Sequence, residues 1–153
     1  MAIPTSEPIT GREENVNPTT PHGALAEFYC AFNARDLELM SKNWLNTNDA
    51  SMDNPLGGIR RGRDEIAQVY RRIFSGKGSV NVEYFDYTIH QFGETFLAVG
   101  RERGAYSDGS TTLELKIRTS RWFCFVDGRF RQLHHHGSIE DAGLLAKYQA
   151  AVH

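Results

Sequence analysis

The sequence predicts an α+β fold, in which a curved antiparallel sheet wraps around N-terminal helices to form a cone with a central pocket. In the first half of the chain apolar residues recur at helical spacing, and from Val80 onward they alternate with the period of two that is typical of strands. Two turn signals, Ser107–Ser110 and Val126–Arg129, each centred on Asp-Gly, divide this second half into a meander. Helices gathered on one face of such a sheet give the α+β class.

Length and composition indicate one soluble globular domain. The chain has 153 residues, of which 40% are hydrophobic and 24% charged, which are ordinary values for such a protein. The net charge of −2 offers no basic surface to nucleic acid or to an anionic membrane, and no apolar run approaches the roughly 18 residues of a membrane span. We therefore expect no nucleic acid and no membrane among its partners, and no cofactor.

The N-terminus and the two cysteines indicate the cellular compartment. The first 21 residues, MAIPTSEPITGREENVNPTTP, lack the apolar core of a secretory signal. Cys30 and Cys124 lie far apart inside apolar segments, which is typical of buried free thiols in a reducing compartment. These features predict a cytoplasmic protein.

Residues 1–20 and 21–153 differ in composition. The first segment is rich in Pro, Ser, Thr, Asn and Glu, and it cannot bury enough apolar surface to hold itself in shape. We therefore expect a flexible N-terminal arm at 1–20 and a single domain at 21–153.

Three helices are expected before the sheet. Thr19 or Thr20 can cap the first helix, where Pro21 suits the first turn, and Asp36 can cap the second. Gly76 ends the third. The expected ranges are about 21–33, 37–45 and 63–75, with a short strand at 50–54 before the third helix.

Four longer strands should follow, at 80–92, 95–106, 111–126 and 129–138. The third is long for a single strand, so we expect a bend or a bulge within it. Residues 139–152 predict either a closing helix or a tail that packs outside the core.

Three stretches, in this order, resemble domains of the nuclear-transport-factor-2-like superfamily, also called SnoaL-like or ketosteroid-isomerase-like. They are AFNARDLELMSKNWL, DNPLGGIRRGRDEIAQVYRRIF and RWFCFVDGRFRQLHHHGS. The third is most similar to the association domain of calcium/calmodulin-dependent protein kinase, whose last hairpin also carries Asp-Gly followed by paired histidines. The superfamily contains isomerases, dehydratases, cyclases, hydrolases and non-catalytic assembly modules, so the resemblance implies the fold more than the function.

The resemblance to ketosteroid isomerases fails at the residues that carry their chemistry. Such an isomerase needs a carboxylate base and two oxyanion donors, a tyrosine and a protonated aspartic acid. The resemblance places the base at Asn54, the tyrosine at Phe28 and the second donor at Arg121. We therefore do not expect steroid isomerisation.

Polar residues are nevertheless expected on the inner face of the sheet. Counting by two from Arg121 places Thr119 and Ile117 beside it, and Leu133, His135 and Gly137 on the last strand. The resemblance to the kinase domain implies pocket arginines at Arg101 and Arg121, and Arg103 shares a face with Arg101. It also places Trp44 and Tyr70 as aromatic residues that close the cavity. The expected ligand-binding residues are thus Arg101, Arg103, Arg121, Tyr70, Trp44 and Thr119.

Buried arginines require anionic partners because a guanidinium stays protonated. Asp53, Glu83, Glu102 and Glu114 are possible partners within the chain. If these carboxylates face outward, a bound small carboxylate would supply the balancing charge. The sequence leaves both alternatives open.

The three consecutive histidines divide between the two faces of the last strand. His134 and His136 share one side, expected to be a subunit contact, and His135 points to the cavity as a candidate for acid–base chemistry. Two histidines without further ligands at suitable spacing do not predict a zinc site.

Two hypotheses follow. The first is a cone that binds a small polar or carboxylated molecule, with His135 and Asn54 as candidate catalytic residues of a lyase- or isomerase-type enzyme. The second is a non-catalytic homodimerisation or assembly module with a residual pocket. The outer sheet face, with Trp122 and Cys124 beside the two outer histidines, would form the homodimer contact.

Overall fold

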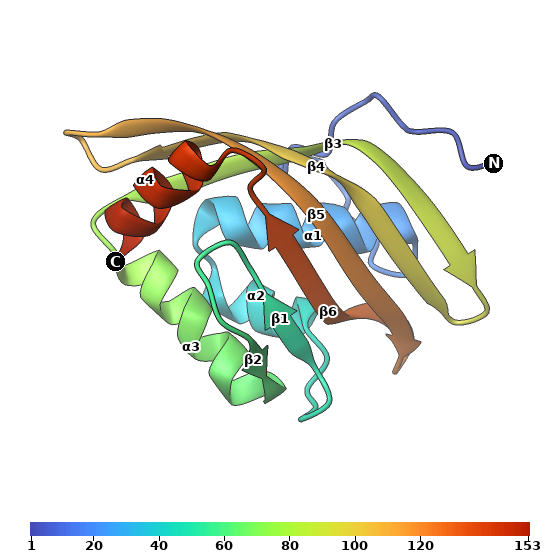
Figure 1. Ribbon diagram of the computed structural model, residues 1–153. Helices are drawn as coiled ribbons and strands as arrows, with labels where there is room; N and C mark the ends of the chain where they lie inside the picture. The colour runs from blue at the N-terminus through green and yellow to red at the C-terminus, as the bar shows by residue number, and fades with distance from the viewer.

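A six-stranded sheet arches over the helices in the computed structural model, which describes residues 1–153 (Figure 1). The strand order is β2-β1-β6-β5-β4-β3. The helices are α1 (Pro21–Ala34), α2 (Leu37–Asn43), α3 (Gly62–Ser75) and α4 (Ala142–Val152). The strands are β1 (Ser51–Asp53), β2 (Arg60–Arg61), β3 (Ser79–Phe92), β4 (Thr95–Ser107), β5 (Thr112–Val126) and β6 (Arg129–Ser138). This arrangement confirms the α+β prediction.

The first two helices begin and end where their capping residues predict. The Thr20 hydroxyl accepts a hydrogen bond from the Gly23 amide at 3.0 Å, and Pro21 occupies the first turn of α1. Arg35 ends α1 in the left-handed region, with φ of 54°. Asp36 then caps α2 through the Leu39 amide at 2.9 Å. This short connection packs α2 against α1 beneath the sheet.

The meander β3–β6 is antiparallel and contains two irregularities. One lies between Phe85 and Thr88 on β3. The other lies opposite Trp122 and Phe123 of β5, where the pairing with β6 shifts by one residue. The extra residue is Leu133 of β6, and β5 pairs with β4 without any shift of register. The bulge expected within β5 therefore lies on its neighbour β6.

The bulge changes which residues of β6 face inward. Gln132 is completely buried and His135 nearly so, whereas Leu133 is only half-buried. Strict alternation predicts that Leu133 and His135 share the inner face of β6. This prediction is wrong, because the extra residue shifts the alternation by one position and Gln132 faces inward instead.

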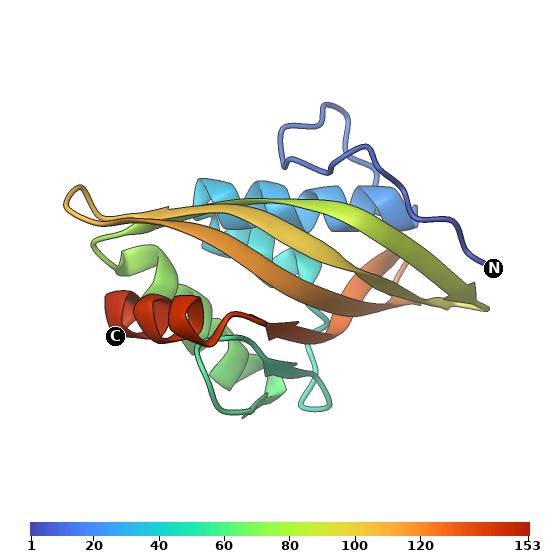
Figure 2. The ribbon, with the colours of Figure 1, turned by 45° about the horizontal axis from the view of Figure 1, so that its top comes forward.

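Two short strands, β1 and β2, extend the sheet beyond β6. β1 pairs with β6 in parallel, and β2, which the sequence pattern did not predict, pairs antiparallel with β1. The loop between β1 and β2 lies at one end of the cone, close to α4 (Figure 2).

The segment expected to be a free arm is attached to the edge of the sheet. The amides of Thr5 and Ile9 donate to the carbonyls of Tyr87 and Tyr84 of β3, both at 2.8 Å. The Ile9 side chain is fully buried. The sequence pattern did not predict that Ile9 is buried, because a single apolar residue has no periodicity.

The closing helix expected near the C-terminus is present as α4, and it contributes Tyr148 to the hydrophobic core. No helix in the chain has both the length and the apolar character that crossing a membrane would require.

Candidate functional site

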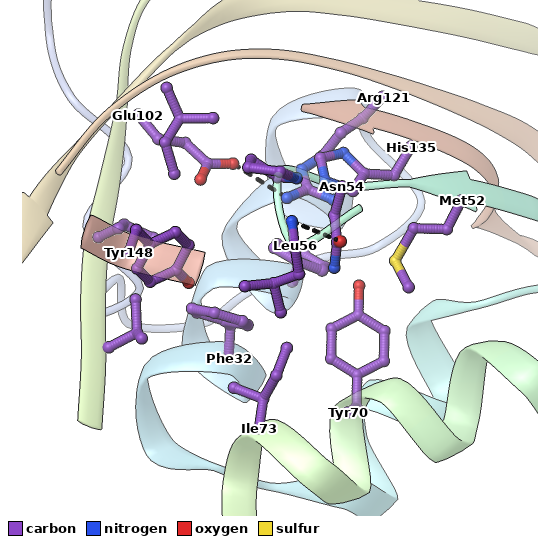
Figure 3. Close-up of a pocket in the computed structure, with 15 residues that line it drawn as sticks. Phe32, Met52, Asn54, Leu56, Tyr70, Ile73, Glu102, Arg121, His135 and Tyr148 are labelled. Atoms are coloured by element: carbon purple, nitrogen blue, oxygen red, sulfur yellow. Dashed lines mark hydrogen bonds and ion pairs between the residues drawn. The ribbon is translucent and has the colours of Figure 1, made fainter. Parts of the chain in front are cut away.

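The cone encloses a small cavity between the inner face of the sheet and the helices (Figure 3). Its volume is about 40 Å³, room for roughly one to three water molecules. Most of the lining is apolar, with Phe28, Phe32 and Ile73 among the residues below the sheet. The polar groups on its wall come from Asn54, Tyr70, Glu102, Arg121, His135 and Tyr148.

Arg121 is buried and its charge is balanced by Glu102. Arg121 Nη2 lies 3.0 Å from Glu102 Oε1, and the two side chains are only 3% and 8% exposed. The guanidinium also donates to Gln132 Oε1 at 2.8 Å and to the Tyr29 hydroxyl at 3.3 Å. Its carbon lies 3.5 Å from the centre of the Phe28 ring. Of the two possible partners, a carboxylate within the chain and a bound carboxylate, the first is therefore correct: Glu102 supplies the charge that balances Arg121.

This ion pair leaves hydrogen-bonding groups unused. A guanidinium has five N–H groups, and Arg121 donates three of them to protein acceptors. Glu102 Oε1 accepts from Arg121 and from the Tyr29 hydroxyl at 2.8 Å, while Oε2 accepts no hydrogen bond from the protein. Two N–H groups and one carboxylate oxygen therefore remain for water or for a ligand.

A chain of buried polar side chains continues from Arg121 through the core. Gln132 donates to Asn43 Oδ1 at 3.2 Å, and Asn43 donates to Glu27 Oε1 at 3.0 Å. Glu27 in turn pairs with Arg129 near the β5–β6 turn. Each ionised member has an oppositely charged partner, so the network is electrically balanced and fixes the orientation of Arg121.

His135 lies beside Arg121 with one ring nitrogen directed to the backbone. Its Nδ1 is 3.3 Å from the Ser120 carbonyl oxygen, which can only accept, so Nδ1 carries the proton of the neutral ring. Burial and the adjacent Arg121 charge hold the pKa of His135 well below its usual range. His135 Nε2 is therefore an unprotonated acceptor without a protein partner.

Asn54 and Tyr70 complete the polar part of the cavity from opposite sides. Asn54 Oδ1 accepts from the Leu56 amide at 3.1 Å, which leaves the Nδ2 group free to donate. The Tyr70 hydroxyl points from α3 toward Asn54 (Figure 3). Burial raises the pKa of Tyr70 to about 12, although the Arg121 charge opposes the shift, so the hydroxyl is protonated at neutral pH.

Arg101 and Arg103 do not line the cavity, contrary to the prediction. Both are exposed on the outer face, where Arg101 pairs with Asp86 and Glu140 and Arg103 pairs with Glu83. The residue of β4 that faces inward between them is Glu102.

The sequence pattern did not show which face of β4 points into the cone, because both faces carry apolar residues. Ala98 pairs directly with Arg121, so the even-numbered residues of β4 share its face. Leu97 and Val99 are also apolar, and alternation therefore did not distinguish the faces. The large residues Phe96 and Tyr106, which share the parity of Glu102 and are buried, were the available signal.

Two further predicted residues lie near the cavity without lining it. Thr119 is buried on the inner face, but its carbonyl accepts the Tyr84 hydroxyl at 3.1 Å and its side chain does not reach the cavity wall. Trp44 packs beside Tyr70, with ring centres 6.3 Å apart, and lines a separate groove between α2 and α3. Gln132 and Glu27, which sequence reasoning did not single out, are instead buried in the polar network.

The outer face of the sheet carries a contiguous apolar patch. Leu97 pairs directly with Trp122 across β4 and β5, and Val99 follows on the same face. Their exposed fractions are 39%, 42% and 41% respectively. The outer histidines lie beside this patch, and His136 Nδ1 contacts Asp53 Oδ2 at 2.8 Å. We define these three apolar residues as the outer patch.

Comparison with solved structures supports the same fold. A candidate dehydratase of the NTF2-like family from Streptomyces avermitilis superposes with a TM-score of 0.72 at 22% identity, covering 78% of this chain and 92% of that protein. A candidate calcium/calmodulin-dependent protein kinase type II association domain from Thiobacillus denitrificans has a TM-score of 0.67 at 24% identity, covering 84% and 100%. An uncharacterised protein with a cystatin-like fold from Caulobacter vibrioides has a TM-score of 0.63 at 20% identity, covering 81% and 89%. At these identities the likeness shows the fold alone.

Sequence comparison identifies the family. No curated protein matches the chain. The model of the SnoaL-like domain family, however, matches residues 22–142, which include α1 and the whole sheet. The chain therefore belongs to the SnoaL-like domain family.

Proposed function

We propose that the cone cavity binds a small neutral molecule bearing carbonyl and hydroxyl groups and promotes a lyase-type proton transfer on it. The observation that carries this proposal is the convergence of an unprotonated His135 Nε2 and the spare N–H groups of a charge-balanced Arg121 on one largely apolar cavity. An acceptor for a proton and donors for a developing oxyanion are the two groups that such chemistry needs.

The ion pair argues for a neutral ligand in place of a carboxylate. The case for a carboxylate depended on an arginine without an internal partner, whereas Glu102 already balances Arg121. A second carboxylate would lie close to the unpaired Glu102 Oε2, and two like charges in a buried site repel each other. A ligand carbonyl oxygen, by contrast, can accept from Arg121 at little electrostatic cost.

The proposed reaction is the dehydration of a β-hydroxy carbonyl compound. His135 Nε2 removes a proton from the carbon next to the carbonyl, and the resulting enolate oxygen accepts hydrogen bonds from Arg121. The C–O bond to the β-hydroxyl then breaks, the imidazolium proton passes to the departing oxygen, and the products are the unsaturated carbonyl compound and water. The Arg121 charge disfavours the imidazolium, so it keeps this intermediate short-lived.

Asn54 and Tyr70 have supporting roles in this proposal. The Asn54 Nδ2 group, directly after β1, and the Tyr70 hydroxyl, on α3, are donors that face each other across the cavity, where they would orient the ligand. The fold-level likeness to a candidate dehydratase is compatible with this reaction.

Diacetone alcohol is a suitable first probe because its dehydration product, mesityl oxide, absorbs in the ultraviolet. We expect the protein to accelerate formation of mesityl oxide, His135→Gln to abolish the acceleration, and Arg101→Ala, an outer-face control, to retain it. If β-hydroxybutyrate binds and turns over while diacetone alcohol does neither, the neutral-ligand proposal is wrong. Equal rates for the His135→Gln variant and the unaltered protein would exclude His135 as the base.

We also propose, as an independent property, that the chain forms a homodimer through the outer patch. Three adjacent apolar side chains, each about two-fifths exposed, are poorly suited to water on an otherwise polar sheet face. A back-to-back pairing of two sheets would bury them against the same residues of a second copy.

Light scattering coupled to gel filtration tests the homodimer. We expect a dimer for the unaltered chain and a monomer for Trp122→Asp. Leu37→Asp is the matched control, because Leu37 is 41% exposed but lies on α2, away from the sheet face. A monomeric unaltered chain, or a Trp122→Asp variant that remains dimeric, would contradict the proposal.

A further inference from the structure

We propose that α4 is a movable cover of the cone cavity and that its Tyr148 determines the size of the ligand that the cavity admits. The inference rests on the proposal that this cavity is the functional site. It goes beyond that proposal because it assigns a role to a helix of which all but the first residue, Ala142, lies outside the part of the chain matched by the family model, residues 22–142.

The cavity is small in this structure. Its volume of about 40 Å³ is far below the roughly 300 Å³ or more of typical small-molecule sites. Several polar groups on its wall nevertheless have donors or acceptors without a protein partner. Burying such groups unpaired costs free energy, so a core that only had to be stable would not contain them. A ligand larger than a few water molecules therefore requires one wall of the cavity to move.

α4 is the wall with the weakest attachment. β3–β6 are held by long hydrogen-bonded ladders, and α1 and α3 contribute several fully or nearly fully buried side chains. α4, by contrast, makes no backbone hydrogen bond to the sheet and contributes one buried residue, Tyr148. Its other apolar residues that pack against the core, Leu144, Leu145, Ala151 and Val152, are only partly buried. α4 lies at one end of the cone (Figure 2). An isolated helix of 11 residues is marginal in water, so α4 depends on these contacts for its stability.

Three side-chain hydrogen bonds hold α4 in place. Gln149 Nε2 donates to the Pro55 carbonyl at 3.0 Å, and the His153 ring contacts the Leu56 carbonyl at 3.2 Å. The Tyr106 hydroxyl donates to the Ala151 carbonyl at 3.2 Å. The first two cross from α4 to the loop after β1, which carries the cavity residue Asn54. All three are bonds that water can replace when α4 moves away.

Tyr148 is the part of α4 that enters the cavity. Its ring lies in the cavity wall (Figure 3), edge to face with Tyr106, with the ring centres 6.3 Å apart. Its hydroxyl makes no hydrogen bond to the protein, and burial raises its pKa, so the hydroxyl remains a donor at neutral pH. Tyr148 therefore both occupies space that a ligand would need and offers a donor to a ligand that fits beneath it.

Native-state hydrogen exchange of the full chain tests the movement. Amides of α4 should exchange through a local opening, with protection factors at least about tenfold lower than those of β4 and β5. Equal protection in α4 and in the central strands would show that α4 leaves the cavity only on global unfolding, and would overturn the inference.

Replacement of Tyr148 tests its role in size selection. Tyr148→Ala removes the volume of a phenol ring from the cavity wall, and phenol is the probe that fits this space. We expect phenol to raise the melting temperature of Tyr148→Ala but not that of the unaltered chain or of Lys147→Ala, a neighbouring exposed control. If Tyr148→Ala does not fold, Tyr148→Cys with the smaller benzene as the probe replaces it. A folded variant without any response to its probe would contradict the assignment of Tyr148.

Neither measurement depends on turnover. If diacetone alcohol is not dehydrated but α4 opens locally and Tyr148→Ala binds phenol, the proposed reaction fails and the role of α4 as a movable cover stands. If dehydration occurs but the amides of α4 are as protected from exchange as those of the sheet, the proposed reaction stands and the role of α4 as a movable cover fails.

Discussion

Glutamine in place of Glu102 removes the charge that balances Arg121 while keeping almost the same shape. The pair joins a side chain that is 3% exposed to one that is 8% exposed, at 3.0 Å. Removal of one partner from a buried pair leaves an uncompensated charge and costs about 3–5 kcal/mol. Because domains of this size unfold with about 5–15 kcal/mol, the expected loss is a large part of the total stability.

Urea denaturation followed by tryptophan fluorescence measures this loss, and a thermal scan should show a decrease of about 6–20 °C at roughly 2–4 °C per kcal/mol. Glu83→Gln is the matched control, because Glu83 also pairs with an arginine across β3 and β4, but at the surface. There the expected loss is below about 1 kcal/mol.

A double-mutant cycle separates the pair from other effects of each substitution. With Arg121→Met added, the cost of Glu102→Gln should fall by about 1–3 kcal/mol, because no guanidinium is then left without its partner. The reasoning is refuted if Glu102→Gln costs no more than Glu83→Gln, or if the two substitutions at the buried pair are additive. Stabilisation by Arg121→Met alone would show that Arg121 is an unbalanced charge after all.

Two further predictions concern His135 and Gly104. The pKa of His135 is lowered in the folded state, so below the unfolded value of about 6.5 the unfolded chain binds a proton that the folded chain does not. The unaltered chain should therefore lose stability relative to His135→Gln as the pH falls from 7 to 5, by up to about 1.4 kcal/mol per pH unit in urea titrations; parallel curves would contradict this. At Gly104 an added Cβ would lie 1.9 Å from the Asn81 carbonyl oxygen, whereas at Gly76 the nearest atom, the Ile73 oxygen, is 3.4 Å away. Gly104→Ala should thus cost more than about 2 kcal/mol in thermal or urea unfolding and Gly76→Ala less than half of that, and similar losses at both sites would refute the steric argument.

Local sequence signals were sufficient for most of the secondary structure. The caps at Thr20 and Asp36, the stop at Gly76 and the two Asp-Gly turns act within a few residues, so α1, α2, α3 and the four long strands lie close to their expected ranges. The inward orientation of Arg121 and His135 was also predictable. β2 was missed because it has only two residues and depends on pairing with β1.

The composition of the cavity wall was decided by the tertiary structure. Alternation relates residues along one strand, but the relation between strands depends on register, and register depends on turns and bulges. The choice of Glu102 over Arg101 and Arg103 follows from the pairing of Ala98 with Arg121, and the inward position of Gln132 follows from the bulge at Leu133.

Sequence alone thus predicted that an arginine and a histidine face the inside of the cone. Only the folded chain decided that Glu102 neutralises this arginine, that a hydrogen bond to Ser120 directs the histidine, and that Tyr148 lines the same cavity. The physical reason is separation along the chain: Glu102, Arg121 and Tyr148 lie 19 or more residues apart. Their contacts are set by the packing of whole elements, which no local pattern encodes.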